Sequence, residues 1–325
     1  MKKLGKLLIF VVKKLGLNNS KRFLKMYDNF FPYIANNADG FVYQLSKSFT
    51  GYIENKEQIS RLTSNMDQES KEIVKKEMRM RKYVLERKGK FLSKHFLGID
   101  RRLINKIDRQ IEKIKKNYIL PIKEGFGEST FYYNHGIHDI EGLKEYVKGK
   151  DVVDCGGYIG DSSLMFTKEL NINKCYCLEP MEENFELALK TIKLNNIGGK
   201  IIPIKKGVGK AKGILKIKKD GPSSYIDSEG DCSIQIDTID SLIKEYNINP
   251  GLIKYDVEGS EYDAILGTEE TIRKYKPILL ISIYHKGKDY FEIKPLIESW
   301  GLGYKFKIRN YCPRNPRFET MLLCY

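Results

Sequence analysis

The sequence has no paired cysteines of the kind that bind zinc or build a disulfide framework. Its six cysteines, among 325 residues, are scattered and include no C-x-x-C pair, and their spacing does not match that of zinc ligands. A chain of this length can bury a hydrophobic core without disulfide bonds. The cysteine pattern therefore favours a reducing compartment, and we expect a cytoplasmic protein.

Long apolar runs are absent as well. The apolar stretch at residues 7–12 is followed at once by Lys13 and Lys14, and no longer stretch is strongly apolar. It is too short for the apolar region of a secretory signal, and a membrane-spanning helix needs about 20 residues. As a basic amphipathic helix it can attach loosely to an anionic bilayer; it can equally pack as a first helix on the domain. We expect a soluble protein with peripheral membrane contact as one option.

Acidic residues are scarce in the first 120 positions. Residues 1–120 contain 28 Lys and Arg against 12 Asp and Glu, whereas residues 121–325 contain 29 against 30. Such a region attracts an anionic membrane, a nucleic acid, or a phosphorylated or nucleotide-linked substrate; a solvated helical surface explains it equally well. Apolar residues recur at helical spacing before Pro121. We expect residues 1–120 to be an all-helical cap, oligomerisation element or substrate region, and a homo-oligomer is one possibility.

Residues 150–181 carry the most informative pattern that is present. An apolar run ends in Asp154 and leads into a glycine-rich turn, a helix start, and a second apolar run that ends in Glu179. This order forms half of a nucleotide-binding α/β unit, in which the glycines admit the ligand and the acid holds a ribose diol. The candidate cofactor-binding residues are Asp154, Gly156, Gly157, Tyr158, Gly160, Asp161, Ser162, Glu179 and Met181.

The identity of the nucleotide follows from two positions. A dinucleotide fingerprint on Gly157 and Gly160 would need a glycine where the chain has Cys155. Asp154 would be a poor neighbour for phosphate oxygens, whereas a carboxylate suits a positively charged ligand. S-adenosylmethionine carries a sulfonium and an amino group. We therefore expect this cofactor, with Glu179 on the ribose hydroxyls and Met181 near the adenine; the alternative is a structural turn without a ligand.

A third acidic strand end supports a single site. Residues 252–255 form an apolar strand pattern that ends in Asp256. In a doubly wound sheet, ligands collect beyond the carboxyl ends of the strands. Asp154, Glu179 and Asp256 stand at three such ends, so one crevice can hold all three.

These motifs resemble those of the FkbM family of S-adenosylmethionine-dependent methyltransferases, over roughly residues 126–325. Residues 154–160 are similar to the first motif of this family, which is usually D-x-G-A-N-x-G. Glu179-Pro180 is similar to its acid–proline pair. Residues 256–261 are similar to its D-V-E-G-x-E motif. Gly157 and Tyr158 depart from the usual Ala and Asn. The strand at 278–284 lacks the glutamate that many members carry shortly before the histidine, so no role of that glutamate transfers.

The resemblance implies a fold and a function. We expect residues 121–325 to form a Rossmann-like class I methyltransferase domain, an α/β sheet that is mostly parallel with an antiparallel edge. The implied acceptor is a sugar or a small substituent of a cell-surface glycan. The residues themselves do not identify the acceptor or distinguish O-methylation from N-methylation.

A hydroxyl acceptor needs a group that takes its proton. The candidates are Asp256, Glu258 and His285, and we favour His285 because the pKa of an unperturbed histidine is about 6.5. Asp256 would then orient the acceptor or the cofactor. Asp256 and Glu258 could instead hold Mg²⁺, which prefers oxygen ligands; we expect a metal-free mechanism.

Two other functions remain open. A nucleic-acid methyltransferase would use the basic region, but the chain lacks aromatic-studded strands for base stacking and the N/D-P-P-Y/F-type motif of many base-methylating enzymes. A non-catalytic Rossmann-like binding or assembly module would have little reason to keep the acidic and glycine positions together. Arg309, Arg314 and Arg317 are either a phosphate or carboxylate clamp or a solvated turn.

Overall fold

A seven-stranded sheet forms the centre of the protein in the computed structural model, which describes residues 43, 45–86, 100–122, 125–220, 223–226 and 232–325. Its strand order is β10-β11-β9-β8-β1-β2-β3. Only β11 runs antiparallel to its neighbours, between β9 and β10. The strands are β1 Asp151–Cys155, β2 Cys175–Leu178, β3 Ile201–Ile204, β8 Pro250–Tyr255, β9 Ile278–Ser282, β10 Phe306–Asn310 and β11 Thr320–Cys324. This confirms the expected mostly parallel Rossmann-like sheet with antiparallel pairing on one side.

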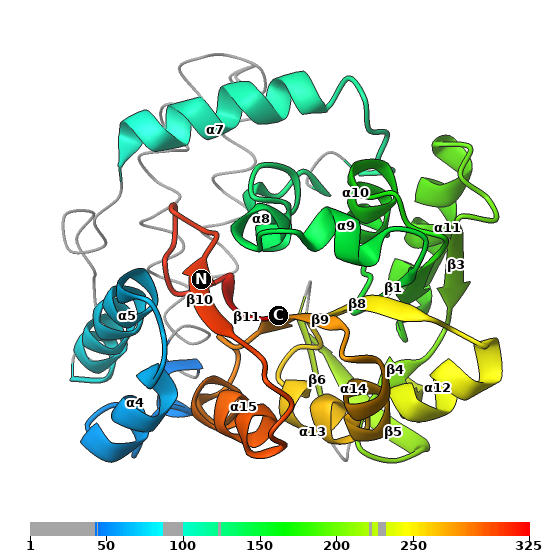
Figure 1. The fold of residues 1–325 in the computed structure, drawn as a ribbon. Coiled ribbons are helices and arrows are strands. Elements are labelled where there is room, and N and C mark those ends of the chain that lie inside the picture. The colour runs from blue at the N-terminus through cyan, green and yellow to red at the C-terminus, as the bar shows by residue number, and fades with distance from the viewer. Residues whose placement is uncertain (1–42, 44, 87–99, 123–124, 221–222, 227–231) are drawn as a thin grey trace.

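Helices cover both faces of this sheet (Figure 1). Neighbouring residues of β1 point to opposite faces, as in any strand, so Val152 lies in one hydrophobic core and Val153 in the other. The first face carries α8 Glu128–Phe131, η2 Asn134–Asp139, α9 Leu143–Val147, α10 Asp161–Glu169 and α11 Glu182–Leu194. The second face carries α12 Ile239–Tyr246, α13 Glu261–Leu266, α14 Glu269–Tyr275 and α15 Gly287–Ser299. Burial on both faces explains why the central strands are mostly apolar.

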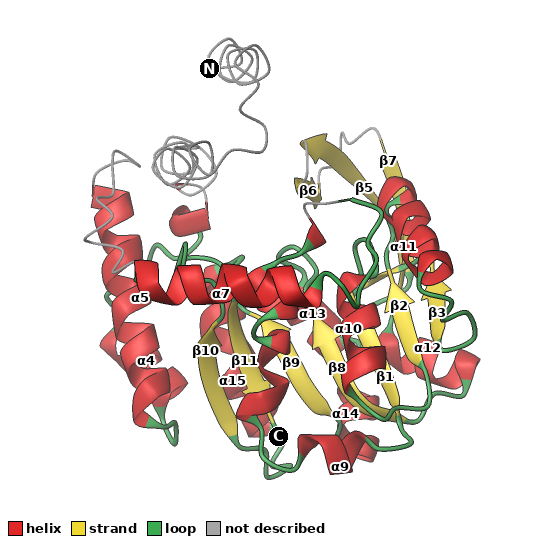
Figure 2. Cartoon of the chain, turned by 90° about the horizontal axis from the view of Figure 1, so that it is seen from above, coloured by secondary structure: helices red, strands yellow, loops and turns green. Residues whose placement is uncertain are grey.

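A second, smaller sheet stands beyond the carboxyl ends of the central strands (Figure 2). Its order is β4-β7-β5-β6. The bounds are β4 Gly207–Val208, β5 Gly213–Asp220, β6 Ser223–Ile226 and β7 Cys232–Asp237. Its position makes it a wall beside the place where ligands of such folds collect.

The described part of the N-terminal region is helical, as expected. It contains α4 Lys56–Thr63, α5 Gln68–Glu86 and α7 Arg101–Ile114. Two arginines of the C-terminal segment bind these helices to the sheet: Arg309 pairs with Asp67 at 2.6 Å, and Arg314 pairs with Asp108 and Glu128. Both arginines therefore have carboxylate partners within the protein. The division of the chain into two units at residue 120 stays a prediction.

No helix in the described part of the chain is long and apolar enough to cross a membrane. The basic apolar stretch at residues 7–12, for which we expected peripheral membrane contact, lies outside the described residues. All six cysteines carry free thiols.

A buried ion pair joins α5 to the carboxyl edge of the sheet. Arg81, only 1% exposed, donates to Glu77 Oε1 at 2.6 Å and to the carbonyl oxygen of Tyr284 at 3.1 Å. Glu77 Oε2 accepts a hydrogen bond from Thr320 at 2.9 Å. The Arg81 guanidinium also lies 3.6 Å from the ring centre of Phe49. The N-terminal helices therefore support the segment that contains His285.

Replacing Arg81 by alanine is expected to lower the free energy of unfolding by about 3–5 kcal/mol, because Glu77 would remain buried without its partner. Chemical denaturation measures this loss. Lys82→Ala is the matched control, since Lys82 lies on the exposed side of the same helix and pairs there with Glu54, which precedes α4. Equal denaturation midpoints for the two variants would show that the buried pair does not stabilise the fold.

Candidate functional site

A cavity of about 840 Å³ opens at the carboxyl ends of β1, β2 and β8. The predicted residues that line it are Gly156, Tyr158, Asp161, Ser162, Glu179, Met181, Asp256 and Glu258. Four others, Asp154, Gly157, Gly160 and His285, do not line it. Helix α7 contributes Asp108, Ile111 and Glu112 to the wall, so the N-terminal region takes part in this cavity.

The glycine turn after β1 is required by close packing. A Cβ atom on Gly156 would lie 1.8 Å from the backbone oxygen of Asp256, and the residue has a φ of +82°. A Cβ on Gly157 would lie 2.3 Å from the Sγ of Cys177. Only glycine lets the turn pass between β8 and β2 at these positions. The neighbouring Tyr158 also has a positive φ, 46°, and is 39% exposed at the cavity.

Glu179 faces the cavity from the end of β2. Its Oε2 accepts a hydrogen bond from the backbone N–H of Tyr158 at 3.0 Å, and its Oε1 accepts one from that of Met181 at 2.9 Å. Burial raises the pKa of Glu179 to about 7, although these hydrogen bonds oppose the shift. The carboxylate is thus fixed in direction and titrates near neutral pH. The neighbouring Met181 packs with Ile217 and Ile234 of the small sheet.

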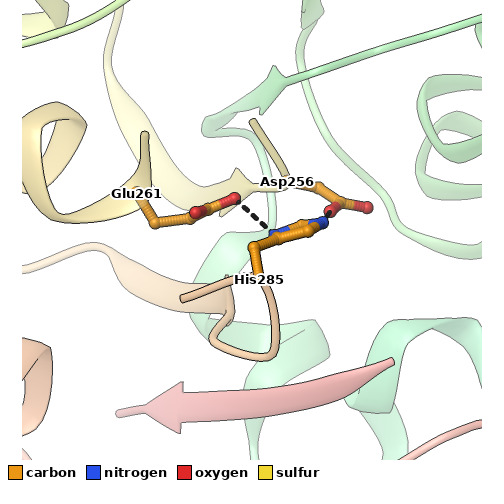
Figure 3. A group of neighbouring side chains, drawn as sticks. All are labelled: Asp256, Glu261 and His285. Atoms are coloured by element: carbon orange, nitrogen blue, oxygen red, sulfur yellow. Dashed lines mark ion pairs between the residues drawn. The ribbon is translucent and has the colours of Figure 1, made fainter. Parts of the chain in front are cut away.

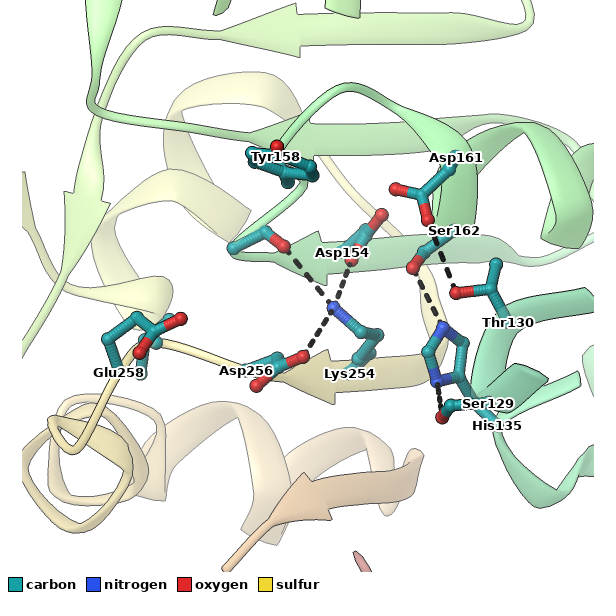
Figure 4. A network of polar contacts seen from close by, with 12 residues as sticks. Ser129, Thr130, His135, Asp154, Tyr158, Asp161, Ser162, Lys254, Asp256 and Glu258 are labelled. Atoms are coloured by element: carbon teal, nitrogen blue, oxygen red, sulfur yellow. Dashed lines mark hydrogen bonds and ion pairs between the residues drawn. The ribbon is translucent and has the colours of Figure 1, made fainter. Parts of the chain in front are cut away.

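Asp154 is placed differently from the sequence expectation. It is fully buried, its Oδ1 accepts from Lys254 Nζ at 3.0 Å, and its Oδ2 accepts from Ser163 Oγ at 2.7 Å. The positive charge that it faces is therefore Lys254, and not a ligand in the cavity. Burial acts to lower the pKa of Lys254, but Asp154 and Asp256 outweigh burial and raise it. This ammonium also lies 3.3 Å from the carbonyl oxygen of Gly156, so the pair stiffens the glycine turn from behind (Figure 4).

The start of α10 carries a second polar group on the cavity wall (Figure 4). The Oγ of Ser162 lies 2.8 Å from His135 Nε2, whose other ring nitrogen lies 3.2 Å from Ser129 Oγ. Burial, aided by Lys254, lowers the pKa of His135 well below its usual range. The imidazole is therefore neutral at physiological pH. Burial raises the pKa of Asp161, which accepts a hydrogen bond from Thr130, to about 6.

Four ionisable side chains meet where β8 and β9 end, and we refer to Asp256, Glu258, Glu261 and His285 as the β8–β9 cluster. His285 Nδ1 lies 3.0 Å from Glu261 Oε1, and its Nε2 lies 3.6 Å from Glu258 Oε2 and 3.9 Å from Asp256 Oδ1. Glu261 is fully buried, and its Oε1 accepts a hydrogen bond from the backbone N–H of Val257. Figure 3 shows the imidazole between the carboxyl groups of Asp256 and Glu261.

The charge state of His285 differs from what a proton acceptor needs. Burial acts to lower its pKa, but Glu261, Glu258 and Asp256 together raise it to about 10. The imidazole therefore carries a proton at neutral pH when the cluster holds nothing else. It also lies behind Asp256 and Glu258, which line the cavity. Both observations count against His285 as the group that takes a proton directly from an acceptor.

The sequence interpretation missed two members of this site. Glu261 belongs to the D-V-E-G-S-E motif, but only Asp256 and Glu258 of that motif are candidates from the sequence. Lys254 stands inside an apolar strand, and its meaning depends on the pairing of β1 with β8, in which Asp154 and Lys254 lie side by side. The motif could have indicated Glu261; no sequence signal fixes that register.

Comparison with known proteins supports the fold and the family. The sequence model of the methyltransferase FkbM domain matches residues 154–306, and a search of curated proteins finds no match. A solved structure, the methyltransferase FkbM from Methylobacillus flagellatus KT, is similar with a TM-score of 0.57 and 20% identity. That match covers 85% of this chain and 60% of that one. This chain thus spans about three fifths of that relative's length, and at this identity the likeness shows the fold.

Two further solved structures are more distant. A putative caffeoyl-CoA O-methyltransferase from Staphylococcus aureus has a TM-score of 0.39 and 12% identity, over 69% of this chain and 97% of that one. A putative rRNA methylase from Clostridium thermocellum has a TM-score of 0.37 and 14% identity, over 59% and 92%. The family assignment rests on the sequence match. The part of this chain that matches the FkbM methyltransferase domain is residues 154–306.

Proposed function

We propose that the protein is an S-adenosylmethionine-dependent methyltransferase whose acceptor is a hydroxyl of a sugar or of a small glycan substituent. The observation that carries this proposal is that two chemically different groups of residues line the same cavity. Glu179 and the apolar group around Met181 lie at one end, and Asp256 and Glu258 lie at the other. A cofactor and an acceptor can therefore meet in the same cavity.

The first end suits an adenosine. The fixed carboxylate of Glu179 can accept hydrogen bonds from both ribose hydroxyls. Met181, Ile217 and Ile234 supply an apolar surface beside it for the adenine ring. The positively charged end of the cofactor would then lie near the glycine turn. The buried Asp154–Lys254 pair would position that turn, with Lys254 lining the cavity and Asp154 behind it.

The second end suits methyl transfer to oxygen. The sulfonium already activates the methyl group, so the protein must mainly align the reactants. The acceptor oxygen forms the new bond to the methyl carbon, the carbon–sulfur bond breaks, and S-adenosylhomocysteine leaves. The hydroxyl proton passes to the β8–β9 cluster, of which Asp256 and Glu258 are the members that line the cavity.

The acceptor class comes from the family resemblance. We infer that the N-terminal region governs access to the acceptor end, which the residues of α7 in the cavity wall support. We place the protein in the cytoplasm, as its six unpaired thiols support. Transfer of labelled methyl groups to nucleotide sugars and glycan fragments, but not to RNA or DNA, would support the acceptor class. Labelling of nucleic acid alone would show that the acceptor is a nucleic acid and not a sugar or glycan.

Calorimetry with S-adenosylhomocysteine tests the cofactor. We expect one site per chain, because the ribose carboxylate and the apolar wall both lie in the described cavity. NAD⁺ is the control, since Cys155 stands where a dinucleotide turn needs glycine. Binding of NAD⁺ without binding of S-adenosylhomocysteine would exclude the proposed cofactor.

A further inference from the structure

Four buried atoms beside the cavity lack hydrogen-bond partners within the described residues. They are Asp256 Oδ1, Glu261 Oε2, His285 Nδ1 and Asp289 Oδ2. The side chains of Glu261 and His285 are 0% and 5% exposed. Leaving a buried polar group unsatisfied costs about 1–3 kcal/mol. Four such atoms in one place indicate that the site is completed by something that the side chains themselves do not supply.

A proton can satisfy only part of this set. Burial, followed by the charge of Glu261, raises the pKa of Asp289 to about 8. Asp289 is then a neutral acid that can donate to Glu261, which accounts for their two unpaired oxygens. It does not account for His285 Nδ1, which lies 3.0 Å from Glu261 Oε1 but outside hydrogen-bond geometry, or for Asp256 Oδ1.

Three side chains of this cluster lie close enough together to hold one ion. Asp256, Glu261 and His285 each offer one ligand atom, and these atoms all lie within 4.8 Å of one another. Two ligands of one ion stand at most about 4–5 Å apart, which is twice a typical metal–ligand distance. The three side chains come from the end of β8, the start of α13 and the segment after β9, and Figure 3 shows them directed toward each other. Carboxylates outnumber cations here, because Lys254, which lies 3.9 Å from Asp256, is shared with Asp154.

We propose that Asp256, Glu261 and His285 bind a divalent first-row transition-metal ion, such as Mn²⁺ or Zn²⁺, at the acceptor end of the cavity. The role of the ion rests on the proposed methyl transfer; its binding does not. This ligand set differs from the Asp256–Glu258 pair considered from the sequence. An imidazole with two carboxylates suits Mn²⁺ or Zn²⁺ better than Mg²⁺, which prefers oxygen ligands.

The position of the ion defines what it can do. Asp256 lines the cavity, whereas Glu261 and His285 lie behind it. The open coordination positions of the ion would therefore face the acceptor. An acceptor hydroxyl bound there would lose its proton more easily, as metal-bound water does. Glu258, which lies outside the ligand set and has a side chain that is 57% exposed, is placed to take that proton.

Direct binding measurements test the site without any methyl acceptor. The full-length protein is stripped with a chelator and titrated with MnCl₂, and free Mn²⁺ is followed by electron paramagnetic resonance. We expect one Mn²⁺ per chain, displaced by Zn²⁺ and only weakly by Mg²⁺. Pulsed measurements should show nitrogen coupling from a directly bound imidazole, which disappears in His285→Ala. Absence of stoichiometric binding, displacement by Mg²⁺ as strong as by Zn²⁺, or absence of nitrogen coupling would overturn the proposal.

The variants separate this site from the outer carboxylate. Glu261→Gln keeps an oxygen for the Val257 N–H and should weaken Mn²⁺ binding by at least about 10–100-fold, the loss found even for outer partners of metal ligands. Glu258→Gln removes the same charge beside the cluster and should change binding by only a few fold. An equal loss in both variants, or no loss in a folded Glu261→Gln, would contradict this ligand set. S-adenosylhomocysteine binding, measured in parallel, reports separately on the proposed function.

Discussion

Asp256→Asn is expected to reduce methyl transfer by about 10²–10⁴-fold, the usual size of a proton-transfer contribution, because the β8–β9 cluster loses a charge at the cavity. S-adenosylhomocysteine affinity should change by only a few fold. Asp256 lines the cavity and also lies 3.9 Å from two buried groups, Lys254 and His285. Asparagine keeps the shape and removes the charge. The loss should therefore appear in kcat and not in cofactor binding.

Asp263→Asn is the matched control, because Asp263 lies seven residues away on α13 and does not line the cavity. It should transfer methyl groups at nearly the wild-type rate. If Asp256→Asn also keeps a rate within a few fold of wild type, the acceptor end of the cavity has been assigned incorrectly.

His285→Ala is expected to give a comparable loss for a different reason. The imidazole lies behind Asp256 and contacts Glu261, so it acts by holding the cluster together. His138→Ala, an exposed histidine on η2, is the control. The two cluster variants should not be additive, since removing either group disables the same unit. Fully additive losses would show that the two residues act separately.

The sequence predicted the end of the sheet at which the site lies, because acidic residues follow three of its buried strands. Glu179 and Asp256 do face one cavity. Asp154 does not, because β1 and β8 pair in a register that places Lys254 beside it. That ion pair replaces the ligand charge inferred from Asp154 alone. A register between strands 100 residues apart is set by packing across the whole sheet, and no local pattern encodes it.

The charge state of His285 could not be predicted from the sequence for a similar reason. An isolated histidine titrates near 6.5, but three carboxylates from two other segments surround this one and raise its pKa to about 10. The helical nature of residues 56–63 and 68–86 followed from the sequence, which predicted an all-helical region over residues 1–120. Their position did not, since it depends on Arg309 meeting Asp67 and on Arg81 reaching the Tyr284 carbonyl.

Glu179→Ala is expected to weaken S-adenosylhomocysteine binding by about 10–150-fold, because a charged hydrogen-bond partner contributes about 1.5–3 kcal/mol. Glu182→Ala, three residues further on and exposed to solvent, should leave the affinity unchanged. Calorimetry on both variants gives the comparison. Circular dichroism checks that Glu179→Ala is folded, because Glu179 also accepts hydrogen bonds from the backbone N–H groups of Tyr158 and Met181.

The affinity of the wild-type protein for S-adenosylhomocysteine should also fall as the pH drops from about 8 to 6. The pKa of Glu179 is about 7, raised from an ordinary 4.5 chiefly by burial. The charged carboxylate that we propose accepts hydrogen bonds from the ribose hydroxyls is therefore lost through this range. The same shift has the opposite effect on the empty fold: a raised acid pKa favours the protonated folded state, so this group opposes folding above pH 7 and does so less as the pH falls. Weaker binding at pH 6 therefore cannot come from unfolding driven by Glu179. Glu179→Gln, which keeps an acceptor but cannot ionise, should bind weakly and equally at both pH values. A pH dependence in Glu179→Gln as steep as in the wild type would assign the titration to another group and remove Glu179 from the ribose site.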